Sequence, residues 1–327
     1  MENQKDRNNV VLIPQILVWI LCLATLASLG ARWSWFLDLF SHFSNQYIIG
    51  GALLIPILIL AKSYRHAALC AVITLLTLIE TRLVLDNPLR FLPSDITHIE
   101  KGITVVQYNQ SIRTINLEQV QQWLNQNSKQ FDIIVLQEAS HHTVDMANSL
   151  KRAYPHQIHE GRHHPFGMVI LSKYKIVEEK INTIPSISHT NIFIRVEIET
   201  PKHPTVLYAI HTMPPVSKSA AKQRNHELSI IAEEIASDQS EHIILVGDFN
   251  LTPTSPYFAR LKEETGLKYQ SFGLLQNPTW HKNHVYPFLK IPIDHVLYST
   301  PFLILDKRVG PAFSSDHHSL IVTLGQR

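Results

Sequence analysis

Cysteine is almost absent from this chain of 327 residues, which contains two. Both, Cys22 and Cys70, lie within long hydrophobic stretches near the N-terminus. The remainder of the chain therefore has neither a disulfide framework nor a zinc site with thiolate ligands. A domain without cysteine is compatible with either side of a membrane.

A surplus of one charge is also missing. The chain has 29 Lys and Arg against 27 Asp and Glu, and residues 96–327 hold 22 of the former and 21 of the latter. A protein that tracks long nucleic acid carries a strong positive field, so this near-neutral balance argues against that class. The same residues contain 17 of the 19 histidines.

Hydrophobic residues form three stretches, at 10–30, 47–61 and 67–85. The first is almost uninterrupted and, at about 1.5 Å per residue, is long enough to cross a hydrocarbon core of ~30 Å. The third carries Glu80 near its end, and the second is short and contains Pro56. We expect three membrane spans, or two if the second stretch is re-entrant.

The basic residues favour a cytoplasmic N-terminus, because four of them flank one side of the expected spans and two flank the other. They are Lys5, Arg7, Lys62 and Arg65, against Arg32 and Arg90. A cleaved signal peptide is disfavoured, since the first stretch is long and lacks a small-residue cleavage site. The sequence thus predicts a multi-pass protein of the bacterial inner membrane with a periplasmic or extracellular soluble domain. Two spans would leave that domain in the cytoplasm.

The expected organisation has four parts. Residues 1–9 form a cytoplasmic tail, residues 10–86 the membrane region, residues 87–102 a linker and residues 103–327 the soluble domain. The soluble domain combines short apolar runs with helical patterns, which is typical of an α/β domain. We see no internal repeat and no low-complexity tract.

Two helices and several strands are expected in the soluble domain. The helices cover 117–127, with Asn116 as N-cap, and 220–237, where Arg224 and the other charges are expected on a solvated face. The alternating strand 192–198 is expected to be half solvated. Polar residues end or flank many strands, at Asn109, Glu138, His211, Asp248, Asp294-His295 and Asp316-His317-His318. Ligand sites in α/β sheets gather at strand ends, so we expect these residues to converge.

The tetrapeptide 247–250 (Gly-Asp-Phe-Asn) is the most informative of these strand ends. The apolar run 243–246 leads into it, so Asp248 and Asn250 follow a buried strand. Burial of a carboxylate is costly unless it meets a metal, a proton or a partner. The interpretation of this loop therefore depends on which other acids and histidines converge on the same strand end.

Seven short motifs stand in an order that resembles the endonuclease/exonuclease/phosphatase superfamily, the DNase I-like fold. They are 107–109 (QYN), 136–138 (LQE), 167–173 (GMVILSK), 210–212 (IHT), 247–250 (GDFN), 293–296 (IDHV) and 315–317 (SDH). The resemblance covers roughly residues 103–324. It implies an α/β (α+β) four-layer sandwich, in which helices flank two packed mixed β-sheets, here preceded by a transmembrane helical segment. It also implies metal-dependent hydrolysis of phosphoesters.

The resemblance assigns a role to each site residue. Glu138 would be the principal ligand of Mg²⁺, with Asn109 beside it and Asp316 completing the metal side; Mn²⁺ or Ca²⁺ are alternatives. Asp248 would orient or deprotonate the attacking water, and Asn250 would bind a phosphate oxygen.

Two histidines complete the implied site. His317 would contact the phosphoryl group, with Asp294 fixing its tautomer and favouring its cationic form. His211 would be the general acid for the leaving group. By contrast, His295 should point away from the side chain of Asp294 if the strand continues, and we expect it to be structural.

The remaining histidines carry less information. His318 is expected to support the site or face solvent. His141, His142 and the cluster at 156–164 are irregularly spaced, so a surface or substrate-side role is favoured over zinc.

The substrate is left open by the fold. A membrane-anchored nuclease-type phosphodiesterase acting on short nucleic acid is the first hypothesis, with Trp280 and its loop as a surface for stacking. A phospholipid or sphingomyelinase-like enzyme acting on a lipid head group, or an inositol-phosphate-type phosphatase, is the alternative. A catalytically silent binding module is a remote third. Membrane lipid is expected to surround the N-terminal helices, and no protein partner is inferable.

Overall fold

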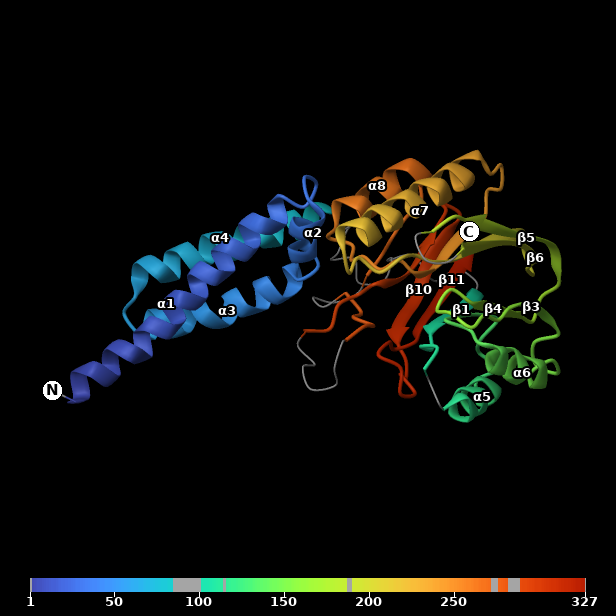
Figure 1. Cartoon of the computed structure of the whole chain (residues 1–327), viewed down its shortest axis with the longest axis horizontal. Helices are drawn as coiled ribbons and strands as arrows, with labels where there is room; N and C mark the ends of the chain where they lie inside the picture. The colour runs from blue at the N-terminus through green and yellow to red at the C-terminus, as the bar shows by residue number, and fades with distance from the viewer. Residues whose placement is uncertain are drawn as a thin grey trace. The chain divides into compact units, whose positions relative to one another are not determined.

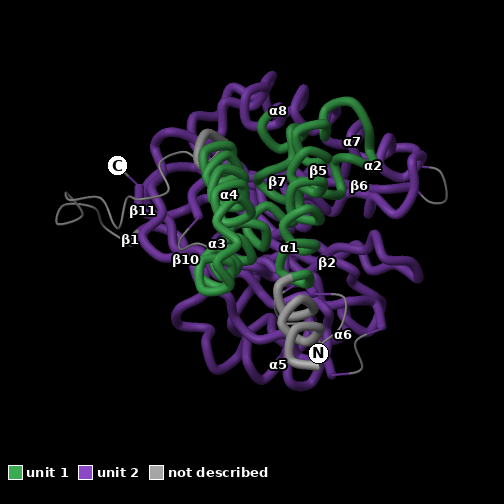
Figure 2. The backbone as a smooth tube through the Cα atoms, turned by 90° about the vertical axis from the view of Figure 1, so that its left-hand side faces the viewer, with its two compact units in different colours: residues 1–86, 252–259 green, residues 87–251, 260–327 purple. Residues whose placement is uncertain are grey.

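The computed structural model describes residues 2–84, 101–113, 116–186, 190–271, 276–281 and 289–326. It divides the chain into two compact units (Figure 2). The first unit comprises Met1–Asp86 and Thr252–Ala259, and the second comprises Asn87–Leu251 and Arg260–Arg327. Most of the expected linker, residues 87–100, lies outside the described residues.

The N-terminal part of the first unit is helical: α1 (Glu2–Leu29), α2 (Trp35–Ser41), α3 (Ser44–Leu60) and α4 (Tyr64–Val84). Among the described residues, α1 and α4 are long and apolar enough to cross a membrane, over Leu12–Leu29 and Tyr64–Thr81. The short helix α2 and the helix α3 form a pair bent by 52°, which would make a third span if the pair is counted as one.

These helices have a packed interior and an apolar exterior. Val18, Leu58 and Cys70 are buried together between α1, α3 and α4. On the outside, Leu60 is 83% exposed. An apolar exterior around a packed interior suits a lipid environment, where no hydrophobic surface needs to be hidden from the surroundings.

Two mixed β-sheets form the core of the second unit (Figure 1). The six-stranded sheet has the order β10 (Phe302–Val309), β11 (Leu320–Gln326), β1 (Lys101–Asn109), β2 (Ile133–Gln137), β4 (Met168–Ser172) and β3 (His156–Glu160). The five-stranded sheet has the order β5 (Ile176–Ile184), β6 (Asn191–Glu199), β7 (Pro204–His211), β8 (Ile243–Asp248) and β9 (Asp294–Tyr298).

The two sheets pack face to face and helices cover them. Apolar side chains of both sheets, such as Val105 on β1 and Val246 on β8, form one buried cluster between them. A second cluster joins the six-stranded sheet to α5 (Leu117–Gln126) and α6 (His141–Ser149). The helix α7 (Lys218–Ser237) lies on the opposite side of the sheets from α5 and α6 (Figure 1). The predicted fold of two mixed sheets flanked by helices is confirmed.

Each sheet contains one parallel pair of strands. The pair β1 and β2 is connected through α5, and the pair β7 and β8 is connected through α7. A helical crossover brings two strands in with the same direction, so their carboxyl ends meet at one edge. Asn109 is opposite Gln137 at the first edge, and His211 is opposite Asp248 at the second.

Some local expectations were wrong. The strand β6 is more buried than the half-solvated strand that was expected, because its sheet packs on the other, although Arg195, Glu197 and Glu199 keep some exposure. Asn116 precedes α5, but its side chain makes no capping hydrogen bond. The sequence patterns also missed β10, the helix at Pro256–Thr265, and the polar segments α6, β3 and β5.

Candidate active site

Three site residues lie side by side at the end of the five-stranded sheet. In the strand register, Asp248 on β8 is opposite His211 on β7 and opposite Asp294 on β9. All three side chains are buried. Ordinary strand pairing therefore brings together residues that are up to 83 positions apart, without any contribution from a flexible loop.

Gly247 allows the strand to approach its neighbour closely at this point. Its φ is +154°, and a Cβ atom placed there would lie 1.9 Å from the carbonyl oxygen of Ile210 on β7. Every other residue type would collide with that backbone, so glycine is required immediately before Asp248.

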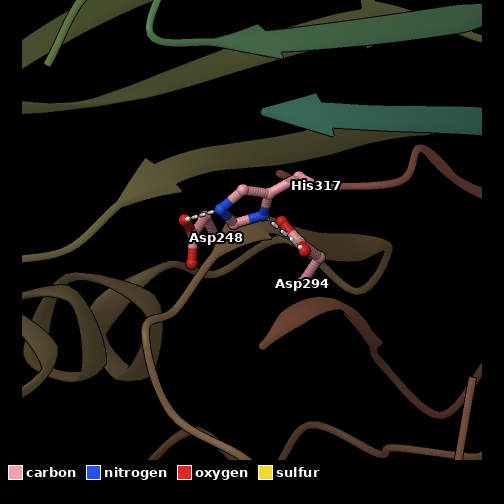
Figure 3. A group of neighbouring side chains, drawn as sticks. All are labelled: Asp248, Asp294 and His317. Carbon is pink, nitrogen blue, oxygen red and sulfur yellow. Dashed lines mark hydrogen bonds and ion pairs between the residues drawn. The ribbon is translucent and has the colours of Figure 1, made fainter. Parts of the chain in front are cut away.

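His317 lies between two carboxylates, as Figure 3 shows. Its Nδ1 donates a hydrogen bond of 2.9 Å to Oδ2 of Asp294, and its Nε2 lies 3.7 Å from Oδ2 of Asp248. The same oxygen of Asp248 is 3.5 Å from Nε2 of His211. Asp248 thus faces two imidazoles, one of which is held by a second carboxylate.

The electrostatics of this group follow from burial and close charges. Burial by itself lowers the pKa of His317, but Asp294 and Asp248 outweigh it and raise that pKa to about 10. Burial raises the pKa of Asp248 to about 6, against the opposing effect of His317. Burial also raises the pKa of Asp294, but the charge and hydrogen bond of His317 outweigh it, so that pKa is lowered. At neutral pH the group therefore holds an imidazolium and two carboxylates.

The second sheet contributes to Asp294. Nε2 of Gln107, on β1, donates hydrogen bonds to Oδ1 of Asp294 at 2.6 Å and to Oε1 of Gln137 at 3.0 Å. The residue is fully buried and connects the two sheets beneath the site. Sequence reasoning missed it, although a glutamine within an apolar strand was a visible signal.

Asn109 and Glu138 lie at the carboxyl end of the parallel pair in the six-stranded sheet. Nδ2 of Asn109 donates to Oε1 of Glu138 at 3.3 Å and to Oδ2 of Asp248 at 3.0 Å. Oε2 of Glu138 accepts a hydrogen bond of 2.8 Å from the backbone nitrogen of Ile112. Asn109 therefore joins the two halves of the site.

Two of the site residues adopt left-handed backbone conformations. The φ angle is +55° at Glu138 and +50° at Asn250. Such a conformation costs about 1–3 kcal/mol in a residue with a side chain, and it persists where surrounding contacts enforce it. Two hydrogen bonds hold Asn250. Its backbone nitrogen donates to Oδ1 of Asp248 at 2.9 Å, and its Nδ2 donates to the carbonyl oxygen of Thr212 at 2.8 Å.

Two side chains of α7 bind the loops that follow β7 and β8. Nη1 of Arg224 donates to the carbonyl oxygen of Asn250 at 3.1 Å, and Oε2 of Glu227 accepts from the backbone nitrogen of Met213 at 2.8 Å. Both helix residues are completely buried. The expectation that Arg224 lies on a solvated face is wrong, because its guanidinium replaces solvent at a loop carbonyl.

Ser315 fixes the segment that carries His317. Its hydroxyl donates to the carbonyl oxygen of Asn109 at 2.8 Å and accepts from the backbone nitrogen of His317 at 3.0 Å. Next to it, Oδ2 of Asp316 accepts a hydrogen bond of 3.0 Å from the indole of Trp280. The indole nitrogen of Trp280 is thus already engaged by the site.

The other histidines of interest lie in different surroundings. The imidazole Nε2 of His295 and the carbonyl oxygen of Leu251 lie 2.9 Å apart, and burial lowers the pKa of that histidine to about 3. Nδ1 of His318 lies 3.0 Å from the carbonyl oxygen of Gly310. His141 and His163 are exposed, with ring centroids 4.5 Å apart.

Two sets of side chains could hold a metal ion. Among the described residues, the side chains of Asp248, Asp294 and His317 place ligand atoms within 4.8 Å of one another. Glu138 and Asp316 do not belong to this group. With its pKa raised to about 10, the imidazole of His317 holds both protons at neutral pH, and a metal ion would have to displace one of them to bind there.

Glu138 and Asn109 fit a cation better. Each oxygen of the half-buried Glu138 carboxylate accepts one hydrogen bond and retains a lone pair. An all-oxygen donor set of this kind suits a hard divalent ion.

This fold and this site define a class of protein. The chain matches the Endonuclease/Exonuclease/phosphatase family over residues 112–317. It therefore belongs to that family, whose predicted resemblance is confirmed. A search of curated proteins found no match.

Solved structures with the same fold include three distant relatives. An endonuclease/exonuclease/phosphatase from Beutenbergia cavernae is 18% identical, with a TM-score of 0.58 over 69% of this chain and 72% of the other. TDP2 of Caenorhabditis elegans is 16% identical, with a TM-score of 0.55 over 68% and 97%. Beta toxin of Staphylococcus aureus, in a structure with bound magnesium ions, is 18% identical, with a TM-score of 0.54 over 68% and 99%.

Proposed function

We propose that this protein is a membrane-anchored, divalent-metal-dependent phosphodiesterase. The observation that carries the proposal is the placement of Asp248 opposite a cationic His317 that Asp294 orients, beside the oxygen donors of Asn109 and Glu138. A base, a cation and a site for a hard metal are groups that together promote hydrolysis of a phosphoester.

Glu138 and Asn109, with Asp316, would hold the metal. The donor set is hard, and Mg²⁺ is the expected ion, with Mn²⁺ or Ca²⁺ as alternatives. A divalent ion bound there supplies a Lewis acid that stabilises negative charge on the phosphoryl oxygens. The magnesium ions in the beta toxin structure support this assignment for the fold.

The protein residues handle the protons. Asp248 is ionised above its pKa of about 6 and accepts a proton from the water that attacks phosphorus. The imidazolium of His317 donates a hydrogen bond to a phosphoryl oxygen as that oxygen gains charge. As the bond from phosphorus to the leaving oxygen breaks, His211 donates a proton to that oxygen.

Asn250 would complete the phosphate contacts. Its Nδ2 already donates to the carbonyl oxygen of Thr212, which fixes the amide plane. The second hydrogen on that nitrogen remains for a phosphate oxygen, since an amide nitrogen has two donors.

The helices α1, α3 and α4 would anchor the protein in a membrane, with the catalytic domain in the periplasm or outside the cell. Their apolar exteriors support the membrane anchor. The excess of basic residues on the side of the spans that carries the N-terminus supports an N-terminus in the cytoplasm. A phosphatase reporter fused after Arg327 should be active in cells if the C-terminus is outside. A reporter that is active only after the cells are broken would place the domain in the cytoplasm.

Nuclease-type activity on short nucleic acid is the proposed reaction, and hydrolysis of a phospholipid head group is the alternative. The near-neutral charge of the domain supports a short substrate over long duplex DNA. The apolar helices would bring the enzyme to a lipid surface, which favours the alternative.

A substrate panel tests the proposal on the full chain in detergent. Oligonucleotides, sphingomyelin, phosphatidylcholine and an inositol phosphate are compared with Mg²⁺ present and after chelation. We expect oligonucleotide hydrolysis that disappears on chelation and in Glu138→Ala. Turnover of lipid with inert oligonucleotides would replace the nuclease assignment, and no metal-dependent turnover of any phosphoester would refute the proposed function.

A further inference from the structure

The first unit includes one segment from far along the chain. This segment, Thr252–Ala259, begins two residues after Asn250 and continues into α8 (Pro256–Thr265). It packs in the same compact unit as the apolar N-terminal helices (Figure 2). A chain that used those helices as a tether alone would not need to contribute this segment.

The carboxylate of Asp38, on α2, is the centre of the contact. Its Oδ1 accepts hydrogen bonds from the hydroxyl of Ser255, at 2.8 Å, and from the hydroxyl of Ser41, at 3.1 Å. Asp38 is 1% exposed and Ser255 is 0% exposed. A carboxylate withdrawn from water to this degree is costly unless such donors satisfy it, so the two segments are bound to each other specifically.

Two further hydrogen bonds surround this one. The hydroxyl of Thr254 donates to the carbonyl oxygen of Ser41 at 2.6 Å, and Nδ1 of His42 lies 3.0 Å from the hydroxyl oxygen of Thr252. Together with the bonds of Asp38, they engage three of the four residues 252–255. The contact therefore binds the segment through three side chains instead of one.

The catalytic loop ends where this segment begins. The carbonyl oxygen of Asn250 accepts from Arg224, and that of Leu251 lies 2.9 Å from Nε2 of His295. The next residue, Thr252, is bound by His42. Each residue of the chain from Asn250 to Thr252 thus has a fixed contact, and the last of these comes from the N-terminal helices.

We propose that Asp38 and Ser255 are positioning residues, through which the membrane helices hold the catalytic loop in its active conformation. The inference rests on the proposed function of that loop. Asp248 and Asn250 depend on a backbone with a left-handed residue at Asn250, and a displacement of about 1 Å at a reacting group costs up to about 100-fold in rate. Loss of the contact should therefore lower kcat while substrate affinity changes little.

The test measures hydrolysis of bis(para-nitrophenyl) phosphate by the full chain in detergent micelles with Mg²⁺. Asp38→Ala and Ser255→Ala should each reduce kcat about tenfold with KM within about twofold. The double variant should be no worse than the worse single variant, because both remove the same hydrogen bond. Asp38→Asn retains an oxygen acceptor and should recover most of the activity.

Ser34→Ala is the matched control. Ser34 caps α2 by accepting a hydrogen bond from the backbone nitrogen of Phe36. It lies at the same helix, and within the described part of the chain it is not hydrogen-bonded to residues 252–255. This variant weakens α2 by about 1 kcal/mol and should leave kcat unchanged. Amide hydrogen exchange gives a second readout, since Asp38→Ala should speed exchange over residues 249–258 and Ser34→Ala should not.

The outcomes separate the two proposals. If Asp248→Ala abolishes hydrolysis while Asp38→Ala and Ser255→Ala retain the kcat of the wild type, the positioning role is wrong and the proposed function stands. If Asp248→Ala hydrolyses as fast as the wild type, the proposed function is wrong and the positioning role falls with it. A reduction of kcat by Ser34→Ala equal to that by Asp38→Ala would also overturn the positioning role, because it would trace the effect to α2 in general.

Discussion

Two aspartates of the second unit, the half-buried Asp238 and the buried Asp248, have opposite environments. Asp238, at the end of α7, accepts hydrogen bonds from Nε of Arg195 at 2.8 Å and from the hydroxyl of Tyr208 at 2.6 Å. Asp248, at the end of β8, faces a second carboxylate and two histidines. Asp248 is fully withdrawn from water and Asp238 only in part, and Asp238 is paired with a permanent cation whereas Asp248 is not.

The pKa values follow this difference. Burial raises the pKa of Asp238, but the hydrogen bonds of Arg195, Tyr208 and Ser240 outweigh it and hold that pKa far below its usual range. At Asp248 burial prevails and raises the pKa to about 6. A buried carboxylate that is fully paired stabilises the fold, whereas one whose pKa lies near neutrality can exchange protons with a substrate. The comparison separates a structural aspartate from the one for which we propose a catalytic role.

The largest expected effect is on activity at Asp248. Replacement by alanine removes the proposed acceptor of the proton from water, and we expect kcat to fall by at least about 1,000-fold. Hydrolysis of a phosphodiester with Mg²⁺ measures it. Asp238→Asn is the matched control and should retain most of the activity, because its carboxylate belongs to a structural ion pair; equal losses at both positions would remove the distinction.

The next effect concerns the loop behind Asp248. Arg224→Ala removes the donor to the carbonyl oxygen of Asn250, and we expect kcat to fall about 10- to 100-fold with little change in KM. Guanidinium ions should restore part of the lost rate by entering the cavity. The exposed Lys222→Ala, on the same helix, is the control and should be neutral. An unchanged kcat in Arg224→Ala would show that the loop does not need this support.

The pH dependence of kcat tests the charges around His317. In the wild type the rate should rise with pH through about 6 as Asp248 ionises, and fall toward about 10 as His317 loses its proton. Asp294→Asn removes the carboxylate that raises the pKa of His317, so the alkaline limb should move to lower pH. An alkaline limb that stays in place would contradict the role given to Asp294.

The smallest effects are on the free energy of unfolding, which Asp238→Asn should lower and Asp248→Asn should raise. Asp238 has a lowered pKa in the folded state, so its contribution is present above the unfolded value and is lost as pH falls. Asp238→Asn should therefore cost about 1–3 kcal/mol of unfolding free energy at neutral pH, since it leaves Arg195 unpaired. The difference in unfolding free energy between Asp238→Asn and the wild type should become smaller as pH falls. Urea unfolding of the full chain in detergent across pH measures it, and an unchanged neutral stability would contradict the structural role.

The sequence predicted the parts of this site that lie at strand ends. Asn109, Glu138, His211 and Asp248 terminate strands of alternating or continuous apolar residues, and strand pairing aligned them as expected. Their types carry chemistry, so the pattern was visible without coordinates.

The contacts that hold the site were not predictable. Helical spacing by itself predicts a solvated face for Arg224. The carbonyl that binds it belongs to a loop 26 residues away, which helical spacing does not reveal. Asp38 and Ser255 are separated by 217 residues, and no local pattern relates them. Burial that depends on distant partners is a property of tertiary packing, and neither periodicity nor propensity records it.

The central claim is that Asp248 is kept buried and ionised for catalysis at a cost to the fold. Its pKa is raised in the folded state, so its stabilising contribution is present below the unfolded pKa and is lost as pH rises through about 6. The most direct measurement takes Asp248→Asn at pH 8 and records both phosphodiester hydrolysis and urea unfolding. We expect a protein that is more stable than the wild type and has lost hydrolysis. A variant that hydrolyses the substrate as fast as the wild type, or that is less stable, would contradict it.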